Sequence, residues 1–134
     1  MSRKKSRVGL VQLMFQSNIQ DNFSEEMVDL FLNNMEFTDS EKKYISTNYM
    51  NLISHLKDID EIISDHVKGW SIDRLSSVDL SVLRVSIYEI YFGKDVPAPV
   101  SINEAVEISK TYGTKDSGKF VNGILGTVYR SLNK

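Results

Sequence analysis

The spacing of apolar residues constrains this chain more than any other feature of its sequence. After Thr38, the residues that recur at intervals of three and four share one face of a helix: Tyr44, Ile45, Asn48, Tyr49, Leu52, Ile53 and Leu56. Similar stripes follow along the chain, whereas a half-buried strand would require clean alternation of apolar and polar residues. The sequence therefore predicts an all-α protein without a sheet.

Two helix starts carry a capping-box signature, a hydroxyl residue followed three positions later by glutamate. Thr38 with Glu41 forms the first, and Ser101 with Glu104 forms the second. Residues 58–61 show a weaker version with aspartate in the first place. We expect a helix to begin at each of these three points.

A further helix is expected from Ser76 and Asp79 to Gly93. Its apolar residues spread around most of the circumference, which is typical of a helix in the middle of a bundle. Pro97 and Pro99 prevent the following stretch from continuing it. This segment is the predicted centre of the fold.

The remaining segments bring the total to about seven helices. A first helix is expected up to about Ser17, a short one after Asn22, and a last one from about Ser117. The stripe that follows the weaker signature reaches Trp70. Gly113 is placed to end a helix in the left-handed conformation that glycine adopts easily.

Composition excludes several classes of protein. The 134 residues suit a single domain over residues 1–134, and the absence of cysteine rules out disulfides and thiolate chemistry. No apolar run approaches the roughly 20 residues of a membrane span, and no apolar segment follows the basic N-terminus as in a secretory signal. We therefore expect a soluble, cytoplasmic protein.

The sequence offers little for catalysis, metal binding or a cofactor. Its two histidines, His55 and His66, do not have the spacing of a metal-ligand pair. Residues 113–119 match the first seven positions of a phosphate-binding P-loop, but Phe120 replaces the hydroxyl residue that would bind magnesium, and no strand precedes them. The turn with Lys115 and Lys119 at a helix start can still bind one or two phosphates, and it is equally consistent with an ordinary turn.

Charge is distributed unevenly, with a basic N-terminal arm. Its cations are Arg3, Lys4, Lys5 and Arg7, with no acid within the first 20 residues. Such an arm is typical of polyanion binding, and equally of a solubilising, unstructured tail. Gln12 can read a base edge and Phe15 can stack on an unpaired base, although a lone aromatic residue is more often core.

Four segments together resemble a known family. They are the basic start at residues 3–15, VDLSVLRVSIYE at 78–89, PVSINEAVEISKTYG at 99–113, and DSGKFVNGIL at 116–125. The chain resembles the NusB family of transcription antitermination factors along nearly its whole length. The resemblance implies a compact bundle of two helical subdomains without catalytic activity.

The resemblance also implies partners and sites. The family is an RNA-binding adaptor that holds the boxA element of ribosomal RNA leaders together with the ribosomal protein NusE, within the antitermination complex of RNA polymerase. Transferred by position, Asp79 would contact the protein partner. The RNA side would comprise Arg3, Lys4, Lys5, Arg7, Gln12, Phe15, Asp116, Lys119, Phe120 and Asn122, to which the turn adds Lys115.

The residue pattern and the family resemblance together suggest one mechanism. The arm becomes ordered on single-stranded RNA, and the turn with Lys115 and Lys119 binds adjacent phosphates. If four arm cations each neutralise a phosphate, log affinity should fall with log salt at a slope of about −3. The short, mixed Lys and Arg arm and Gly118, where the family commonly has a larger polar residue, are departures from the pattern. A homo-oligomeric helical scaffold without specific RNA binding is the alternative, and a monomer or a homodimer remains open.

Overall fold

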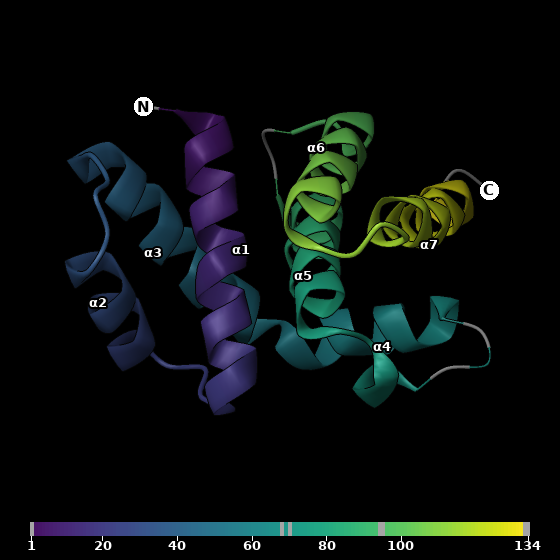
Figure 1. The fold of residues 1–134 in the computed structure, drawn as a ribbon, viewed down its shortest axis with the longest axis horizontal. Helices are drawn as coiled ribbons and strands as arrows, with labels where there is room; N and C mark the ends of the chain where they lie inside the picture. Colours follow the sequence, from purple (N-terminus) through teal and green to yellow (C-terminus); the bar gives the residue numbers. More distant parts are fainter. Residues whose placement is uncertain (1, 68, 70, 94–95, 133–134) are drawn as a thin grey trace. The chain divides into compact units, whose positions relative to one another are not determined.

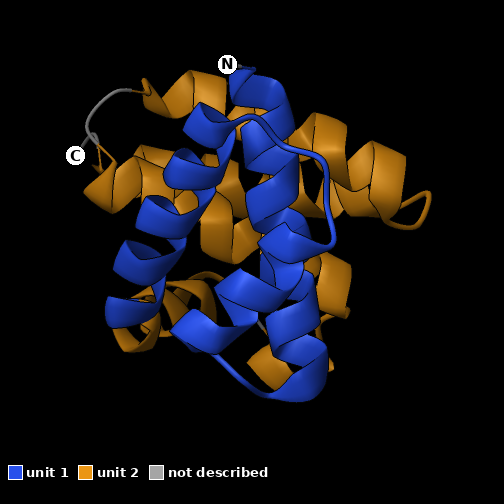
Figure 2. Ribbon diagram, turned by 90° about the vertical axis from the view of Figure 1, so that its left-hand side faces the viewer, with its two compact units in different colours: residues 1–55 blue, residues 56–134 orange. Residues whose placement is uncertain are grey.

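A computed structural model describes residues 2–67, 69, 71–93 and 96–132 of the chain. Within these residues it contains seven α-helices and one short 3₁₀ helix (Figure 1). They are α1 (Arg3–Gln20), α2 (Glu25–Asn33), α3 (Asp39–Ser54), α4 (Leu56–His66), η1 (Ile72–Arg74), α5 (Ser77–Phe92), α6 (Ala98–Tyr112) and α7 (Ser117–Leu132). No strand occurs in these residues, so the all-α prediction is confirmed. The helices form two compact units, residues 1–55 and 56–134 (Figure 2).

Unit 1 is a three-helix cluster in which α1, α2 and α3 each pack on the other two. Tyr49 of α3 is fully buried, and its hydroxyl lies 2.7 Å from the Ser17 hydroxyl of α1. Ser17 in turn donates to the Leu13 carbonyl at 2.9 Å. Burial raises the pKa of Tyr49 above its ordinary value of 10.0. A polar contact in the core therefore joins the two longest helices of this unit.

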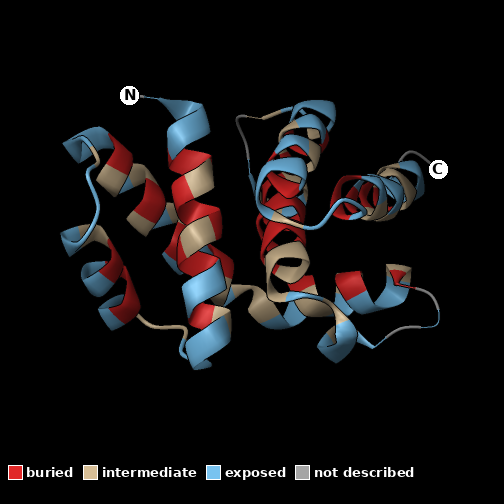
Figure 3. Cartoon of the chain, in the orientation of Figure 1, coloured by how far each residue is buried: buried red, intermediate tan, exposed pale blue. Residues whose placement is uncertain are grey.

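Unit 2 is organised around α5, which packs against α4, α6 and α7. Residues 81–89 of α5 are all buried, as the red ribbon of Figure 3 shows, and this confirms the predicted central helix. The Arg84 guanidinium binds both carboxylate oxygens of Asp60 on α4, at 2.9 and 2.8 Å. This two-point ion pair fixes the orientation of α4 on α5.

Several predicted boundaries are confirmed. Thr38 and Glu41 form the capping box at the start of α3, with both reciprocal hydrogen bonds present. The Ser76 hydroxyl accepts from the Asp79 amide at the start of α5, and Gly93 ends that helix. The last helix begins at Ser117. These starts are determined by residues that lie close together in the sequence.

Other boundary predictions are wrong. Helix α6 begins at Ala98 with proline in its first turn, so Ser101 lies inside the helix instead of capping it. Helix α4 begins at Leu56, before Asp58, and it ends at His66. Gly113 has φ −95° and ψ −162°, which is extended and not left-handed. Trp70, predicted on the apolar stripe of that helix, lies outside the described residues.

A glycine is needed at 113 for a different reason. A Cβ atom built there would lie 2.4 Å from the Ser117 hydroxyl oxygen and 2.8 Å from the Ser109 carbonyl oxygen. The backbone thus passes too close to its neighbours for a side chain. Close approach, and not a positive φ, explains the residue.

Candidate nucleic-acid interface

The basic arm is already helical in the structure. Helix α1 begins at Arg3, and the Ser2 hydroxyl caps it by accepting from the Lys5 amide at 3.1 Å. Cations at a helix start face the positive end of the helix dipole, and α1 has no acid in its first turn. Because residues 3–7 already lie in α1, the structure replaces the predicted ordering of the arm on RNA with an arm that is helical beforehand.

Helix α3 supplies the contact that holds this start. One carboxylate oxygen of Glu41 accepts from the Ser2 amide at 3.0 Å, and the other accepts from the Thr38 amide at 2.9 Å. These backbone hydrogen bonds lower the pKa of Glu41 below its ordinary value of 4.5, and the one from Thr38 has the largest effect. A single carboxylate thus joins the starts of two helices.

Two of the arm cations lie over aromatic rings of the same unit. The Lys5 ammonium is 5.4 Å from the centre of the Phe37 ring, and the Arg3 guanidinium is 5.8 Å from the centre of the Tyr44 ring. A cation over a ring face is attracted by the ring's quadrupole while it stays accessible. The rings therefore restrict these side chains without neutralising them.

Exposure divides the predicted arm residues. Arg3, Lys4 and Lys5 are exposed, whereas Arg7 is only 5% exposed. A buried guanidinium is poorly placed to meet a phosphate. The arm therefore presents three accessible cations instead of the four counted in the sequence.

Further along α1, Phe15 is not a core residue. Its side chain is 37% exposed, and Ile19, one turn later, is 62% exposed. Gln12, one turn before Phe15, is half-buried. An exposed aromatic ring near a polar side chain is suited to stacking and base-edge contacts, so the core interpretation of Phe15 is wrong.

In unit 2, the predicted lysine turn lies between α6 and α7. The Thr114 amide donates to the Ser117 hydroxyl at 2.9 Å, and the Asp116 amide donates to the Thr114 hydroxyl at 3.3 Å. These local hydrogen bonds fix the turn. The side chains that it and the first turns of α7 expose are Lys115, Asp116, Lys119 and Asn122, while Phe120 is half-buried.

A shallow hollow of about 420 Å³ adjoins this turn on α6 and α7. Lys119 and Asn122 line it together with Asn103 and Lys110, two residues that sequence reasoning missed. A Cβ atom at Gly118 would lie 2.9 Å from Lys110 Cγ. The glycine that departs from the family pattern therefore makes room for a lysine stem.

Asp79, the predicted partner residue, lies in the first turn of α5. One of its carboxylate oxygens is shielded from solvent and receives no hydrogen bond from the described residues. A buried acceptor of this kind gains from an added donor. The side chain as a whole is half-buried.

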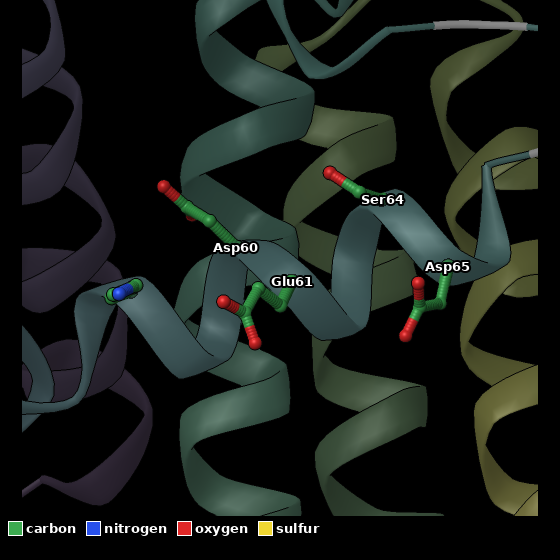
Figure 4. A pocket seen from close by; sticks show the side chains of 5 residues that line it. Asp60, Glu61, Ser64 and Asp65 are labelled. Carbon is green, nitrogen blue, oxygen red and sulfur yellow. The ribbon is translucent and has the colours of Figure 1, made fainter.

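Unit 2 also carries acidic side chains on α4. Asp60, Glu61 and Asp65 line a hollow of about 430 Å³ there, together with Ser64 and Lys57 (Figure 4). Asp60 already forms an ion pair with Arg84.

Clustered metal ligands and membrane-spanning helices are both absent from the described part of the chain. Within residues 2–67, 69, 71–93 and 96–132, no group of three or more His, Asp or Glu side chains could hold a metal ion, and no helix is long and apolar enough to cross a membrane.

Comparison with known proteins identifies the family. The model of the NusB family matches residues 4–130. The chain belongs to the NusB family. Transcription antitermination protein NusB of Ruminiclostridium cellulolyticum is 40% identical over 128 residues, which cover 96% of this chain and 88% of that protein. NusB of Halalkalibacterium halodurans is 35% identical over 125 residues, covering 93% and 91%.

Solved structures of NusB proteins have the same fold. T. maritima NusB is 34% identical and superposes with a TM-score of 0.88 over 97% of this chain and 92% of its own. A chain of the crystal structure of antitermination factors NusB and NusE in complex with dsRNA is 27% identical, with a TM-score of 0.84 over 96% of each chain. The all-helical NusB fold predicted from the sequence is thereby confirmed.

Proposed function

We propose that this NusB-family antitermination factor binds the boxA element of ribosomal RNA leaders together with the ribosomal protein NusE. It would act in the cytoplasm as a non-catalytic adaptor within the antitermination complex of RNA polymerase. The observation that carries the proposal is an N-terminal helix ordered with three exposed cations, in a fold shared with a NusB bound to NusE and dsRNA. No cofactor is needed for such a role.

The RNA surface of unit 1 is the exposed side of α1. Arg3, Lys4 and Lys5 attract phosphates irrespective of sequence, while Gln12 and Phe15 supply base-edge and stacking contacts. The buried Arg7 acts as a structural residue in this proposal. Phosphate contacts set the register, and base contacts give the preference for a particular RNA.

The RNA surface of unit 2 is the start of α7. Lys115 and Lys119 attract phosphates, and they are helped by the positive end of the helix dipole. Asp116 and Asn122 offer polar groups to base edges, and Phe120 offers an aromatic ring. Asp79 would contact NusE, because it stands in the first turn of α5 at the position where the family carries an acid that contacts this partner.

Salt dependence tests the RNA surface of unit 1. In fluorescence anisotropy with a short boxA RNA, the triple variant R3A/K4A/K5A should flatten the slope of log affinity against log salt by about 2, at about 0.7 per phosphate contact. The matched control K57A/R74A/R130A removes three exposed cations from unit 2 and should leave the slope unchanged. Equal effects of the two triples would contradict a localised RNA surface on α1.

The strandedness of the RNA tests the base contacts. The same boxA sequence should bind more tightly as a single strand than as a duplex, because Phe15 and Phe120 can stack only on bases that are unstacked. A duplex that binds equally well would leave only the phosphate contacts. The similar NusB–NusE structure contains dsRNA, which makes the duplex an informative competitor.

The alternative, a homo-oligomeric scaffold, predicts a different outcome. An affinity-tagged chain should recover NusE and boxA RNA if the adaptor proposal is right. Self-association in sedimentation experiments without recovery of either partner would favour the scaffold.

A further inference from the structure

We infer that Glu41 is a positioning residue for RNA binding, because its carboxylate fixes the cationic start of α1 in a helical conformation. This inference rests on the proposed RNA surface of unit 1. Glu41 lies on α3, 39 residues from Ser2, and it would not itself touch RNA. It would act through Arg3, Lys4 and Lys5.

The start of α1 needs outside support. Three consecutive cations occupy its first turn, where the unpaired backbone N–H groups of the helix already carry partial positive charge. An acid in this turn would stabilise the helix but would also weaken attraction for phosphates. The chain has no acid there, so the charges of the first turn disfavour the helix start, although the Ser2 hydroxyl caps it.

Glu41 supplies the negative charge from another helix. It is only 3% exposed, and its two oxygens accept from the backbone amides of Ser2 and Thr38 at 3.0 and 2.9 Å. The Thr38 hydroxyl accepts from the Glu41 amide at 3.2 Å, which completes the capping box. The capping box at the start of α3 thus fixes the orientation of the carboxylate that binds the start of α1.

This arrangement stabilises the helix start and leaves its cations accessible. Both Glu41 oxygens bind backbone N–H groups, while Arg3, Lys4 and Lys5 remain exposed to solvent. Lys5 and Arg3 rest over the rings of Phe37 and Tyr44, which belong to the segment before α3 and to α3 itself. Helix α3 and the segment before it therefore position the arm through one carboxylate and two rings.

The inference predicts an effect opposite in sign to simple electrostatics. Glu41→Gln removes a negative charge near a surface that binds a polyanion, so charge alone would strengthen RNA binding. Gln has one acceptor oxygen where Glu has two, so it cannot accept from the Ser2 and Thr38 amides together. With that oxygen kept by Thr38 in the capping box, the Ser2 amide loses its acceptor, and RNA binding should weaken. Glu36→Gln is the matched control, because Glu36 is exposed and lines the same hollow as Lys5 and Phe37.

The experiment measures RNA affinity and its salt slope for both variants. For each phosphate that the arm no longer neutralises, E41Q should weaken binding of a short boxA RNA about fivefold at 0.1 M salt and flatten the slope by about 0.7. Hydrogen exchange of the Lys5 and Ser6 amides, which donate to Ser2, should become faster. E36Q should bind as tightly as the original chain or more tightly. If E41Q matches E36Q in affinity and slope, the inference is wrong.

A second background separates positioning from general destabilisation and from the proposed function. In the R3A/K4A/K5A variant, E41Q should have no further effect on RNA affinity, because the residues through which it acts are gone. A further decrease of similar size would overturn the inference. If the triple variant itself binds RNA normally, the proposed surface fails; if the triple weakens binding and E41Q does not, only the positioning role fails.

A third pair of variants covers the case in which E41Q does not fold. Ser2→Pro removes the backbone N–H that donates to Glu41 but leaves the capping box of α3 intact, while Ser2→Ala removes only the hydroxyl cap. S2P should bind RNA more weakly than S2A. Equal affinity of these two variants would contradict the role of the Glu41 carboxylate.

Discussion

The same four-residue signature predicts one helix start in each unit, and the two predictions have opposite structural outcomes. In unit 1, Thr38 and Glu41 form a capping box with reciprocal hydrogen bonds at the start of α3. In unit 2, Ser101 and Glu104 lie inside α6, one turn after its first residue. The hydroxyl that was expected to cap a helix is instead fully buried and lacks a hydrogen-bond partner among the described residues.

The residues that precede each signature explain the difference. Helix α6 begins at Ala98 after Pro97, and a proline in its first turn fits the helix without sacrificing a hydrogen bond. The amide of Ser101 already donates to the Pro97 carbonyl at 3.2 Å, so the helix has begun before the signature. Thr38 has ψ 164°, so the chain is extended there. A capping box marks a helix start only where the preceding residues are not helical.

The largest expected effect is the loss of the real cap. Thr38→Ala should lower the free energy of unfolding by about 1–2 kcal/mol, because the Glu41 amide loses its acceptor. Chemical denaturation would measure this, with Thr47→Ala, an exposed substitution within α3, as control. A Thr38→Ala cost no larger than that of Thr47→Ala would show that the box contributes no stability.

A smaller effect is expected in acid. The pKa of Glu41 is lowered in the folded protein, so its contribution to stability is fully present above about pH 4.5 and is lost as the pH falls through the lowered value. The nearby Lys5 ammonium acts in the same direction as the backbone amides. The stability difference between the original chain and Glu41→Gln should therefore shrink between about pH 5 and strongly acidic solution. A constant difference over this range would contradict the role of the charge.

Local patterns predicted much of the fold. The stripes of α3, α5 and α7 and the N-caps of α3 and α5 come from residues within a few positions of each other, and these helix starts were predicted correctly. The RNA residues of α1 were proposed from a linear cluster, but whether Arg7 is buried and Phe15 exposed depends on tertiary packing. The Glu41 hydrogen bond with Ser2 joins residues 39 apart, and no spacing rule encodes it. Short-range chemistry was therefore predictable, while its tertiary use was not.

The smallest expected effect tests the false signature directly. Ser101→Ala should leave the free energy of unfolding within about 0.5 kcal/mol of the original value, or raise it, because a buried hydroxyl without a partner among the described residues is removed. Ser109→Ala in the same helix is the control: Ser109 is equally buried, but its hydroxyl donates to the Ala105 carbonyl at 2.8 Å, so its replacement should cost more. If Ser101 were the cap that its sequence suggests, its replacement would cost about 1 kcal/mol. A cost of that size would move the start of α6 to Ser101 and remove the contrast between the two signatures.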